Sequence, residues 1–438
     1  MNKRRMYLER GKNALIILLS LSAVLLILQT DQYGSLMEDS HFLTEISQML
    51  GSGESGTLSG SGLSAGESAA GIVTPTSMAV NSAAGMHYGV KYDADGLESC
   101  YGHFSALLGE ALGSSGAPEK RTEEQWREVL SAEGVYFDFS GALPLRVLAG
   151  LLGTEMTSAA GGDAARRLCL VREQEGVSLW YLRDSDEVYY RCRTALNYAL
   201  LSARLEAYVP NGAFFAWEAG QDDMLDPYFL FLESMPDLNR LEVEYAVPSE
   251  TAVEAMLGVL GMNRFVASRY DEADGTIVYV EEDKSLRLYA DGTLVFRLIG
   301  DESGDGSVTS AETAAAVETA LRLAASVQDV YGGNAAFVCT DVSYNSGTDE
   351  QTIRFDYVVE GIPLRWGGDS AFTVTLRKGT VVRLTAYLWD FRIGERSVPL
   401  PEVQAAAVVT ASGGGEPMLI YELQGNSAVP AWVIRPMG

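Results

Sequence analysis

A helix followed by several short strands recurs along the second half of the chain, and this repetition constrains the fold more than any other feature. The first copy opens with an apolar helical face in residues 248–261 and continues as strand-like segments to residue 299. The second copy opens with residues 309–327 and reaches Trp389, and a third, shorter copy follows from residue 400. One helix followed by antiparallel strands, repeated, is typical of modules with helices on one sheet face. We therefore predict an α+β fold.

Turn sequences within the copies support antiparallel strands. Asp274-Gly275 and Asp291-Gly292 separate strand-like segments, and both predict tight hairpins in which both turn residues have positive φ. Lys378-Gly379 marks another turn. Apolar and polar residues alternate over 372–377, so one face of that strand is expected in the core and the other in water.

The sequence before residue 248 has patterns that predict a mixture of helices and strands. Thr122 and Gln125 have the spacing of a capping box at the start of a helix. The aromatic stretch 180–190 predicts cross-strand packing in a hairpin that turns at residues 184–186, with a peptide-binding groove as the alternative. The remaining segments are a strand over 134–140 and helices over 103–113, 122–130, 143–153 and 193–208.

An apolar run near the N-terminus predicts a membrane anchor. Residues Ala14–Leu28 carry no charge, and five Lys/Arg residues precede them within residues 1–12. Basic residues stay on the cytoplasmic side, so the rest of the chain is expected outside the cell. The run is short for a full span, which needs about 20 residues. Because no small-residue cleavage site follows it, we favour an uncleaved anchor over a cleaved signal peptide, which remains the alternative.

The charge of the exported part excludes one class of partner. The chain holds 32 Lys/Arg and 59 Asp/Glu. With residues 1–12 set aside, 27 basic and 58 acidic residues remain. This acidic balance argues against binding nucleic acid or an anionic lipid surface, and it is typical of a soluble exterior domain.

Four cysteines all lie in the expected exterior part, at Cys100, Cys169, Cys192 and Cys339. They are widely spaced and form no CxxC pair, so metal ligation is not expected. Four thiols allow three complete pairings, and the sequence cannot choose among them. Both a disulfide and buried free thiols remain open, with free thiols favoured.

The sequence offers no recognisable catalytic motif. Its three histidines, His41, His87 and His103, lie before or near the start of the expected folded body. The GxSxG pattern at residues 62–66 lies in the Gly/Ser-rich segment with no predicted strand before it, and there is no HExxH pair. We therefore expect a non-enzymatic protein without a cofactor, and a secreted hydrolase is the least favoured alternative.

One acidic loop has the spacing of a calcium site. In residues 301–312, acids stand at the first and fifth positions, Gly at the sixth and Glu at the twelfth. The alternative is an acidic loop that merely caps the following helix. The favoured reading of the loop is this capped helix start, with calcium as the less favoured possibility. The candidate calcium ligands are Asp301, Ser303, Asp305, Ser307 and Glu312.

Several stretches resemble the YycH and YycI family of membrane-anchored regulators. Residues 135–153, 226–245 and 281–298 are similar to YycH, and residues 356–389 and 429–434 are similar to YycI and to PepSY-type modules. The resemblance implies a single-pass protein whose exterior α+β body regulates a cell-wall sensor histidine kinase. The long Gly/Ser-rich segment 50–75 and the four cysteines depart from the family pattern.

The resemblance, the anchor and the copies together give the expected organisation. The implied partners are a sensor histidine kinase and a related membrane accessory protein, with the chain in the cell membrane and its N-terminus cytoplasmic. The alternative is an exterior peptide- or ligand-binding PepSY-like module that restrains a protease. The expected segments are a basic tail (1–12), an anchor (13–30), a stem and linker (31–76), a first α/β-type exterior domain (77–236), a helix-plus-sheet module (237–300) and a YycI/PepSY-like module (301–438).

Overall fold

The computed structural model describes residues 73–174, 176–220, 224–245, 248–299, 310–331, 333–366 and 369–435. All of them lie in the unit Ser64–Gly438. The expected basic tail, anchor and stem up to residue 72 lie outside the described residues, so the predictions for them stay predictions. Within the described ranges, no helix is both long enough and apolar enough to cross a bilayer.

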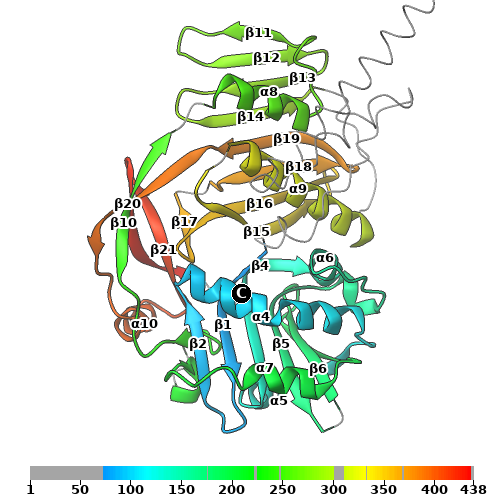
Figure 1. Cartoon of the computed structure of the whole chain (residues 1–438), viewed down its shortest axis with the longest axis vertical. Coiled ribbons are helices and arrows are strands. Elements are labelled where there is room, and N and C mark those ends of the chain that lie inside the picture. The colour runs from blue at the N-terminus through cyan, green and yellow to red at the C-terminus, as the bar shows by residue number, and fades with distance from the viewer. Residues whose placement is uncertain are drawn as a thin grey trace, which may run out of the picture. The chain divides into compact units, whose positions relative to one another are not determined.

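The N-terminal half is built on an antiparallel sheet with the strand order β2-β1-β4-β5-β6-β7-β3 (Figure 1). Its first strand begins at Pro75, inside the segment that the sequence assigns to the linker. The strands are β1 (Pro75–Asn81), β2 (His87–Lys91), β3 (Glu119–Arg121), β4 (Gly134–Pro144), β5 (Ala164–Glu173), β6 (Gly176–Arg183) and β7 (Val188–Arg193).

Both faces of this first sheet are covered, as the alternation along β4 requires. Val135 and Phe137 belong to the main core, whereas Tyr136 between them belongs to a separate cluster on the other face. The helices are α4 (Ala94–Gly113), α5 (Glu123–Leu130), α6 (Leu145–Leu151) and α7 (Tyr198–Leu205). Apolar residues of α4, α6 and α7 join the main core, and those of α5 join the second cluster with the short hairpin of β8 (Phe214–Phe215) and β9 (Leu230–Phe231).

The structure confirms some predicted details of this region and corrects others. The capping box of Thr122 and Gln125 is present, and the hairpin turns after Arg183 with Tyr181 stacked on Tyr190 at 5.4 Å between ring centroids. Helix α4 starts at Ala94, earlier than expected, because the Asp93 side chain caps it. The helix expected over 193–208 is confined to α7, since β7 runs to Arg193.

The second half contains the two predicted copies, joined through their last strands. The first copy is α8 (Glu250–Val259) with β11 (Ser268–Asp271), β12 (Ile277–Glu281), β13 (Lys284–Leu288) and β14 (Thr293–Leu298). The second is α9 (Ser310–Tyr331) with β15 (Ala336–Asn345), β16 (Glu350–Val359), β18 (Phe372–Arg377) and β19 (Thr380–Tyr387). Strand β14 pairs antiparallel with β19, so both predicted modules share one sheet, and α8 and α9 lie on the same side of it (Figure 1).

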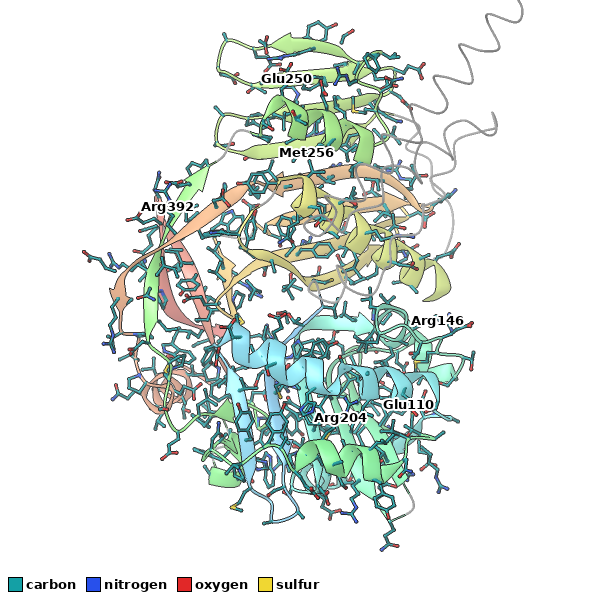
Figure 2. All side chains as sticks on the ribbon, viewed as in Figure 1. Glu110, Arg146, Arg204, Glu250, Met256 and Arg392 are labelled. Carbon is teal, nitrogen blue, oxygen red and sulfur yellow. The ribbon has the colours of Figure 1, made fainter. Side chains whose placement is uncertain are left out.

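Side-chain burial explains why α8 and α9 pack on this sheet. On α8 the apolar residues Val253, Met256 and Leu257 are buried, while Glu250 in the first turn is exposed (Figure 2). Apolar residues three and four positions apart share one helix face, and that face enters the main core. The prediction of helices on one face of a repeated antiparallel sheet is confirmed here.

The two Asp-Gly turns differ from the predicted geometry. In each turn only the glycine has positive φ, Gly275 at 88° and Gly292 at 81°, whereas Asp274 and Asp291 do not. The amide of Gly275 donates a hydrogen bond to the carbonyl of Glu272. The connection is therefore a longer loop with glycine in the left-handed conformation, and not a two-residue turn. Lys378 and Gly379 do both have positive φ, at 49° and 78°.

The third copy and three further strands complete the large sheet. Its strand order is β11-β12-β13-β14-β19-β18-β16-β17-β21-β22-β10-β20, with β15 pairing with β16 off this path. The sequence analysis did not identify β17 or β20. These elements are α10 (Glu402–Ala411), β10 (Leu238–Tyr245), β17 (Ile362–Arg365), β20 (Trp389–Ser397), β21 (Glu416–Gln424) and β22 (Ser427–Arg435).

Candidate functional site

The predicted calcium loop lies almost wholly outside the described residues. Only Glu312 of its candidate ligands is described, in the first turn of α9, with an exposed side chain. Within the described part of the chain, no group of three or more His, Cys, Asp or Glu residues has the geometry of a metal site. The calcium site and its alternative, a capped helix start, therefore both stay predictions.

His87 has a structural environment that the sequence did not indicate. Its Nδ1 lies 2.8 Å from Asn81 Oδ1 and its Nε2 lies 3.1 Å from Glu218 Oε1. Glu218 also accepts a hydrogen bond of 2.7 Å from the backbone N–H of Phe215. The set ties β2 to the β8 hairpin, beside an open cavity of about 420 Å³. His103 is exposed on α4, and its Nδ1 lies 3.1 Å from the hydroxyl of Tyr208.

All four cysteines are free and buried. Burial raises the pKa of Cys100 to about 11 and that of Cys339 to about 12. It also raises the pKa of Cys192 to about 12, and it raises that of Cys169. Of the two states left open by the sequence, the structure therefore shows free thiols in an unreactive environment.

The most charged buried region joins the first sheet to the C-terminal strands. Arg166 on β5 donates to Asp138 on β4 through Nε (2.6 Å) and Nη2 (3.1 Å). The same guanidinium donates to both oxygens of Glu416 on β21, at 2.9 and 2.7 Å. The three side chains are 11–14% exposed, so these contacts form in a largely dehydrated setting.

A second arginine extends this network. Arg167 Nη2 donates to Asp226 at 2.9 Å, and its Nε approaches Asp138 at 3.4 Å. Adjacent strand residues normally point to opposite faces. Here the register between β5 and β6 shifts between Ala165 and Arg167, and this bulge lets both arginines reach the same carboxylate.

A buried lysine makes a separate link between the two halves. Lys91 on β2 lies 2.5 Å from Glu402 at the start of α10, and both side chains are at most 4% exposed. Lys91 also donates to the carbonyl of Leu230 and lies 3.9 Å from the ring centroid of Phe229. The other oxygen of Glu402 accepts a 2.7 Å hydrogen bond from the amide of Leu232.

Burial and pairing act in opposite directions on these groups. Burial raises the pKa of Asp138, but Arg166 and Arg167 outweigh it and hold that pKa below its usual value. For Glu416 burial prevails, and the pKa is raised. Burial lowers the pKa of Lys91 although Glu402 opposes the shift. The network therefore combines Asp138, whose ionised form is favoured by two arginines, with Glu416 and Lys91, whose charged forms are destabilised by burial.

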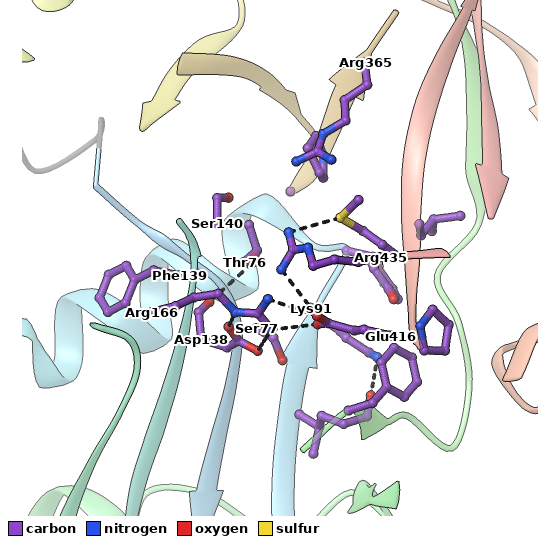
Figure 3. Close-up of a pocket in the computed structure, with 18 residues that line it drawn as sticks. Thr76, Ser77, Lys91, Asp138, Phe139, Ser140, Arg166, Arg365, Glu416 and Arg435 are labelled. Carbon is purple, nitrogen blue, oxygen red and sulfur yellow. Dashed lines mark hydrogen bonds and ion pairs between the residues drawn. The ribbon is translucent and has the colours of Figure 1, made fainter. Parts of the chain in front are cut away.

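A cavity of about 70 Å³ opens beside this network (Figure 3). It lies where β1, β2 and β4 of the first sheet meet β17, β21 and β22 of the large sheet. Thr76, Ser77 and Ser140 contribute hydroxyls to its wall. The charged residues of its wall are Lys91, Asp138, Arg166, Arg365, Glu416 and Arg435.

The residues of this junction were not predicted as a site from the sequence. A signal was present, because Arg166-Arg167 precedes the apolar run 168–171 and Asp138 stands between two aromatic residues. A charged residue inside a strand of otherwise buried residues is expected to have a partner. Glu416 lies 250 positions from Arg166 in the sequence, so this pairing cannot be recognised without the fold.

Comparison with known proteins gives a likeness in fold alone. The sequence matches no protein-family model and no curated protein sequence. The structure is similar to the crystal structure of YycH from Bacillus subtilis, with a TM-score of 0.54 and 11% sequence identity. The likeness covers 84% of this chain and 94% of that chain. The chain therefore has a YycH-like fold, which the sequence resemblance of residues 135–153, 226–245 and 281–298 had implied.

Proposed function

We propose that the chain is a non-enzymatic, membrane-tethered exterior regulator of a sensor histidine kinase involved in cell-wall homeostasis. The observation that carries the proposal is the YycH-like fold, which extends over 84% of the chain. The sequence stretches that resemble YycH include β4, β10 and the β13–β14 hairpin of this structure. The proposed partners are the kinase and a related membrane accessory protein.

Features of the sequence support the proposed location. The basic segment 1–12 followed by the apolar run 14–28 suits an anchor with a cytoplasmic N-terminus. The acidic body is repelled by anionic lipid headgroups, and the Gly/Ser-rich composition of residues 50–72 is typical of a tether. Contact with the kinase is then proposed to occur both within the bilayer and outside it.

The geometry of the junction agrees with a binding protein whose charged residues serve its architecture. The carboxylates of Asp138 and Glu416 are both engaged by arginine, and Glu402 by Lys91. Such pairs stabilise one arrangement of the two halves, because breaking one partner leaves a buried charge. A regulator that transmits a state of its exterior body to a membrane partner needs a defined arrangement of this kind.

A reconstitution experiment tests the proposal. The full chain and the source organism's cell-wall sensor kinase are placed together in nanodiscs, and kinase autophosphorylation is measured. We expect the chain to change the autophosphorylation rate and to cross-link to the kinase. A matched control replaces residues 13–30 with an unrelated apolar span, which should keep membrane insertion but weaken the effect.

Two results would contradict the proposal. One is an autophosphorylation rate that is the same with and without the chain, together with no cross-link to the kinase. The other is capture of a peptidase from the native membrane with loss of its activity, which would favour the PepSY-like alternative.

A further inference from the structure

We propose that the junction cavity binds a single oxyanion group, held between Arg365 and Arg435. The group is inorganic phosphate, or the phosphate or carboxylate of a larger ligand. This site goes beyond the proposed function, because it requires neither a kinase nor a membrane. It rests on the arginine geometry, two hydroxyls without partners, the charge of the cavity wall and the size of the cavity.

The two arginines face one another across the cavity from different strands (Figure 3). Arg365 on β17 uses its Nε to bond Asp356 at 3.2 Å, and its two terminal nitrogens have no partner among the described residues. Arg435 on β22 donates to Glu416 at 3.3 Å and to the sulfur of Met418 at 3.3 Å, and a thioether is a weak acceptor. Donors therefore remain on both guanidinium groups, and guanidinium donors match the oxygens of phosphate and carboxylate.

Two hydroxyls in the same wall lack a hydrogen-bond partner in the described structure. Ser140 Oγ belongs to a residue that is only 8% exposed, and Ser77 Oγ is also buried. A buried hydroxyl without a partner is destabilising, and an oxyanion in the cavity would accept a hydrogen bond from it. Ser140 on β4, Arg365 on β17 and Arg435 on β22 all line this cavity (Figure 3).

The cavity wall presents more positive than negative groups. Of the described residues that line it, four are cationic and two are acidic. The carboxylates of Asp356 and Glu402, which pair with Arg365 and Lys91, are not part of the wall. The wall therefore carries a net charge of about +2, and Asp138 and Glu416 are its only two carboxylates among the described residues.

The volume of the cavity suits a small ligand. The space open to the centre of a water-sized sphere is about 70 Å³, and a single water needs about 10–15 Å³ by this measure. The cavity therefore has room for a tetrahedral or planar oxyanion. Because Ser140, Arg365 and Arg435 lie on strands of both sheets, a bound oxyanion would join the first sheet to the large sheet and stabilise the folded state.

The melting temperature of the full chain measures this binding. It is recorded against rising sodium phosphate at constant ionic strength, with sodium acetate as the carboxylate arm and sodium chloride as the baseline. We expect phosphate to raise the melting temperature in a saturable way. A rise with acetate of equal size assigns the site to a terminal carboxylate group, and a rise with phosphate alone assigns it to phosphate.

Variants separate this site from a general salt effect. Arg365→Gln and Arg435→Gln should each weaken phosphate binding about tenfold, since each removes a charge-assisted hydrogen bond. Ser140→Val keeps every charge and should weaken binding less. The matched control is Arg396→Gln, because Arg396 pairs with Asp237 at the exposed strand β20. It should respond to phosphate as the wild type does.

Each variant is compared with its own phosphate-free baseline, so a loss of basal stability does not affect the test. Should Arg435→Gln fail to fold, Arg435→Lys and Ser140→Val still report on the site. The proposal is overturned if phosphate and acetate both leave the wild-type melting temperature at the chloride baseline. It is also overturned if the Arg365 and Arg435 variants respond as strongly as Arg396→Gln.

Discussion

Asp138 receives two arginines because β5 has one irregular step beside it. Arg166 and Arg167 would point to opposite faces of a regular strand, and only one of them would reach the carboxylate. The bulge at this point brings both to Asp138, and Tyr136 donates to the same carboxylate at 3.3 Å. A single local distortion thus determines which charges meet at the junction.

Replacing Asp138 with Asn should destabilise the protein in a pH-dependent way. At neutral pH we expect a loss of about 3–5 kcal/mol, because two buried guanidinium groups lose a charged partner. The folded-state pKa of Asp138 lies below its ordinary value, so its contribution is complete above the unfolded-state pKa and is lost as pH falls through the folded-state pKa. The stability gap between wild type and variant should therefore narrow on acidification below about pH 4.

Urea unfolding of the full chain at neutral and acidic pH measures that gap. Asp237→Asn is the control, since Asp237 is 74% exposed and pairs with an exposed arginine. It should change stability little at either pH. A constant gap across the pH range would show that Asp138 does not titrate as the structure implies.

The four thiols should be inert in the folded protein. Burial raises all four thiol pKa values, and a thiol reacts through its thiolate. We expect DTNB at mildly alkaline pH to label none of them in the native full chain and all four in urea. Labelling in urea that appears only after a reductant is added would instead identify a disulfide.

At the scale of elements, one hairpin turn of the large sheet contacts the helix α4 that packs on the first sheet. Glu360 and Gly361 link β16 to β17 with positive φ at both residues, 52° and 77°. A Cβ atom on Gly361 would lie 3.0 Å from the backbone nitrogen of Asp93, which caps α4. The turn therefore presses directly on the start of a helix in the other half of the molecule.

Gly361→Ala should cost more stability than Gly379→Ala. Gly379 has nearly the same φ, 78°, in a turn of the same kind, but an added Cβ there meets nothing within 4 Å. Left-handed backbone alone costs about 1–2 kcal/mol for a residue other than glycine, so Gly379→Ala should lose that amount. Gly361→Ala adds a close contact with the start of α4. The difference between the stability losses of the two variants, measured by calorimetry, gives the contribution of that contact. Equal losses would mean that the turn does not bear on the helix.

The elements that the sequence predicted are those with a strong local pattern. The helix α8 has its apolar residues at helical spacing, and apolar and polar residues alternate in the sequence of β18, although Thr375 on the face expected in water is buried as well. Strand β20 was missed because "WDFRIGERS" has few apolar residues, and it is held by pairing with β10. Long-range pairing also explains why the junction site was missed, since its partners come from β4, β17, β21 and β22. The order of segments along the sequence indicated the likeness to YycH. It could not indicate the cavity where the two sheets meet.

At the scale of the whole molecule, Lys91 and Glu402 connect residues more than 300 positions apart. Glu402→Gln should destabilise the chain by about 3–5 kcal/mol, because it leaves a buried lysine without a charged partner. Lys91→Met should also destabilise the chain, because it leaves the buried carboxylate of Glu402 without a charged partner. The double variant should lose less than the sum of the two single losses, because neither unpaired charge remains.

A double-mutant cycle from chemical denaturation gives this coupling. Arg392 and Glu244 form an exposed pair 2.9 Å apart on neighbouring strands and supply the control cycle, where coupling should be small. Additive losses at Lys91 and Glu402 would show that the two halves are not joined energetically through this pair.

The position of β1 in the first sheet has a mechanical consequence. This strand follows directly on the residues that precede the described body, and it is paired on one side with β2 and on the other with β4. Tension that arrives through the preceding chain acts along β1, so the hydrogen bonds on both sides resist it together in shear. A strand at the edge would instead be peeled away one bond at a time. In the proposed membrane-tethered protein, the body would thus be attached through a strand that resists pulling.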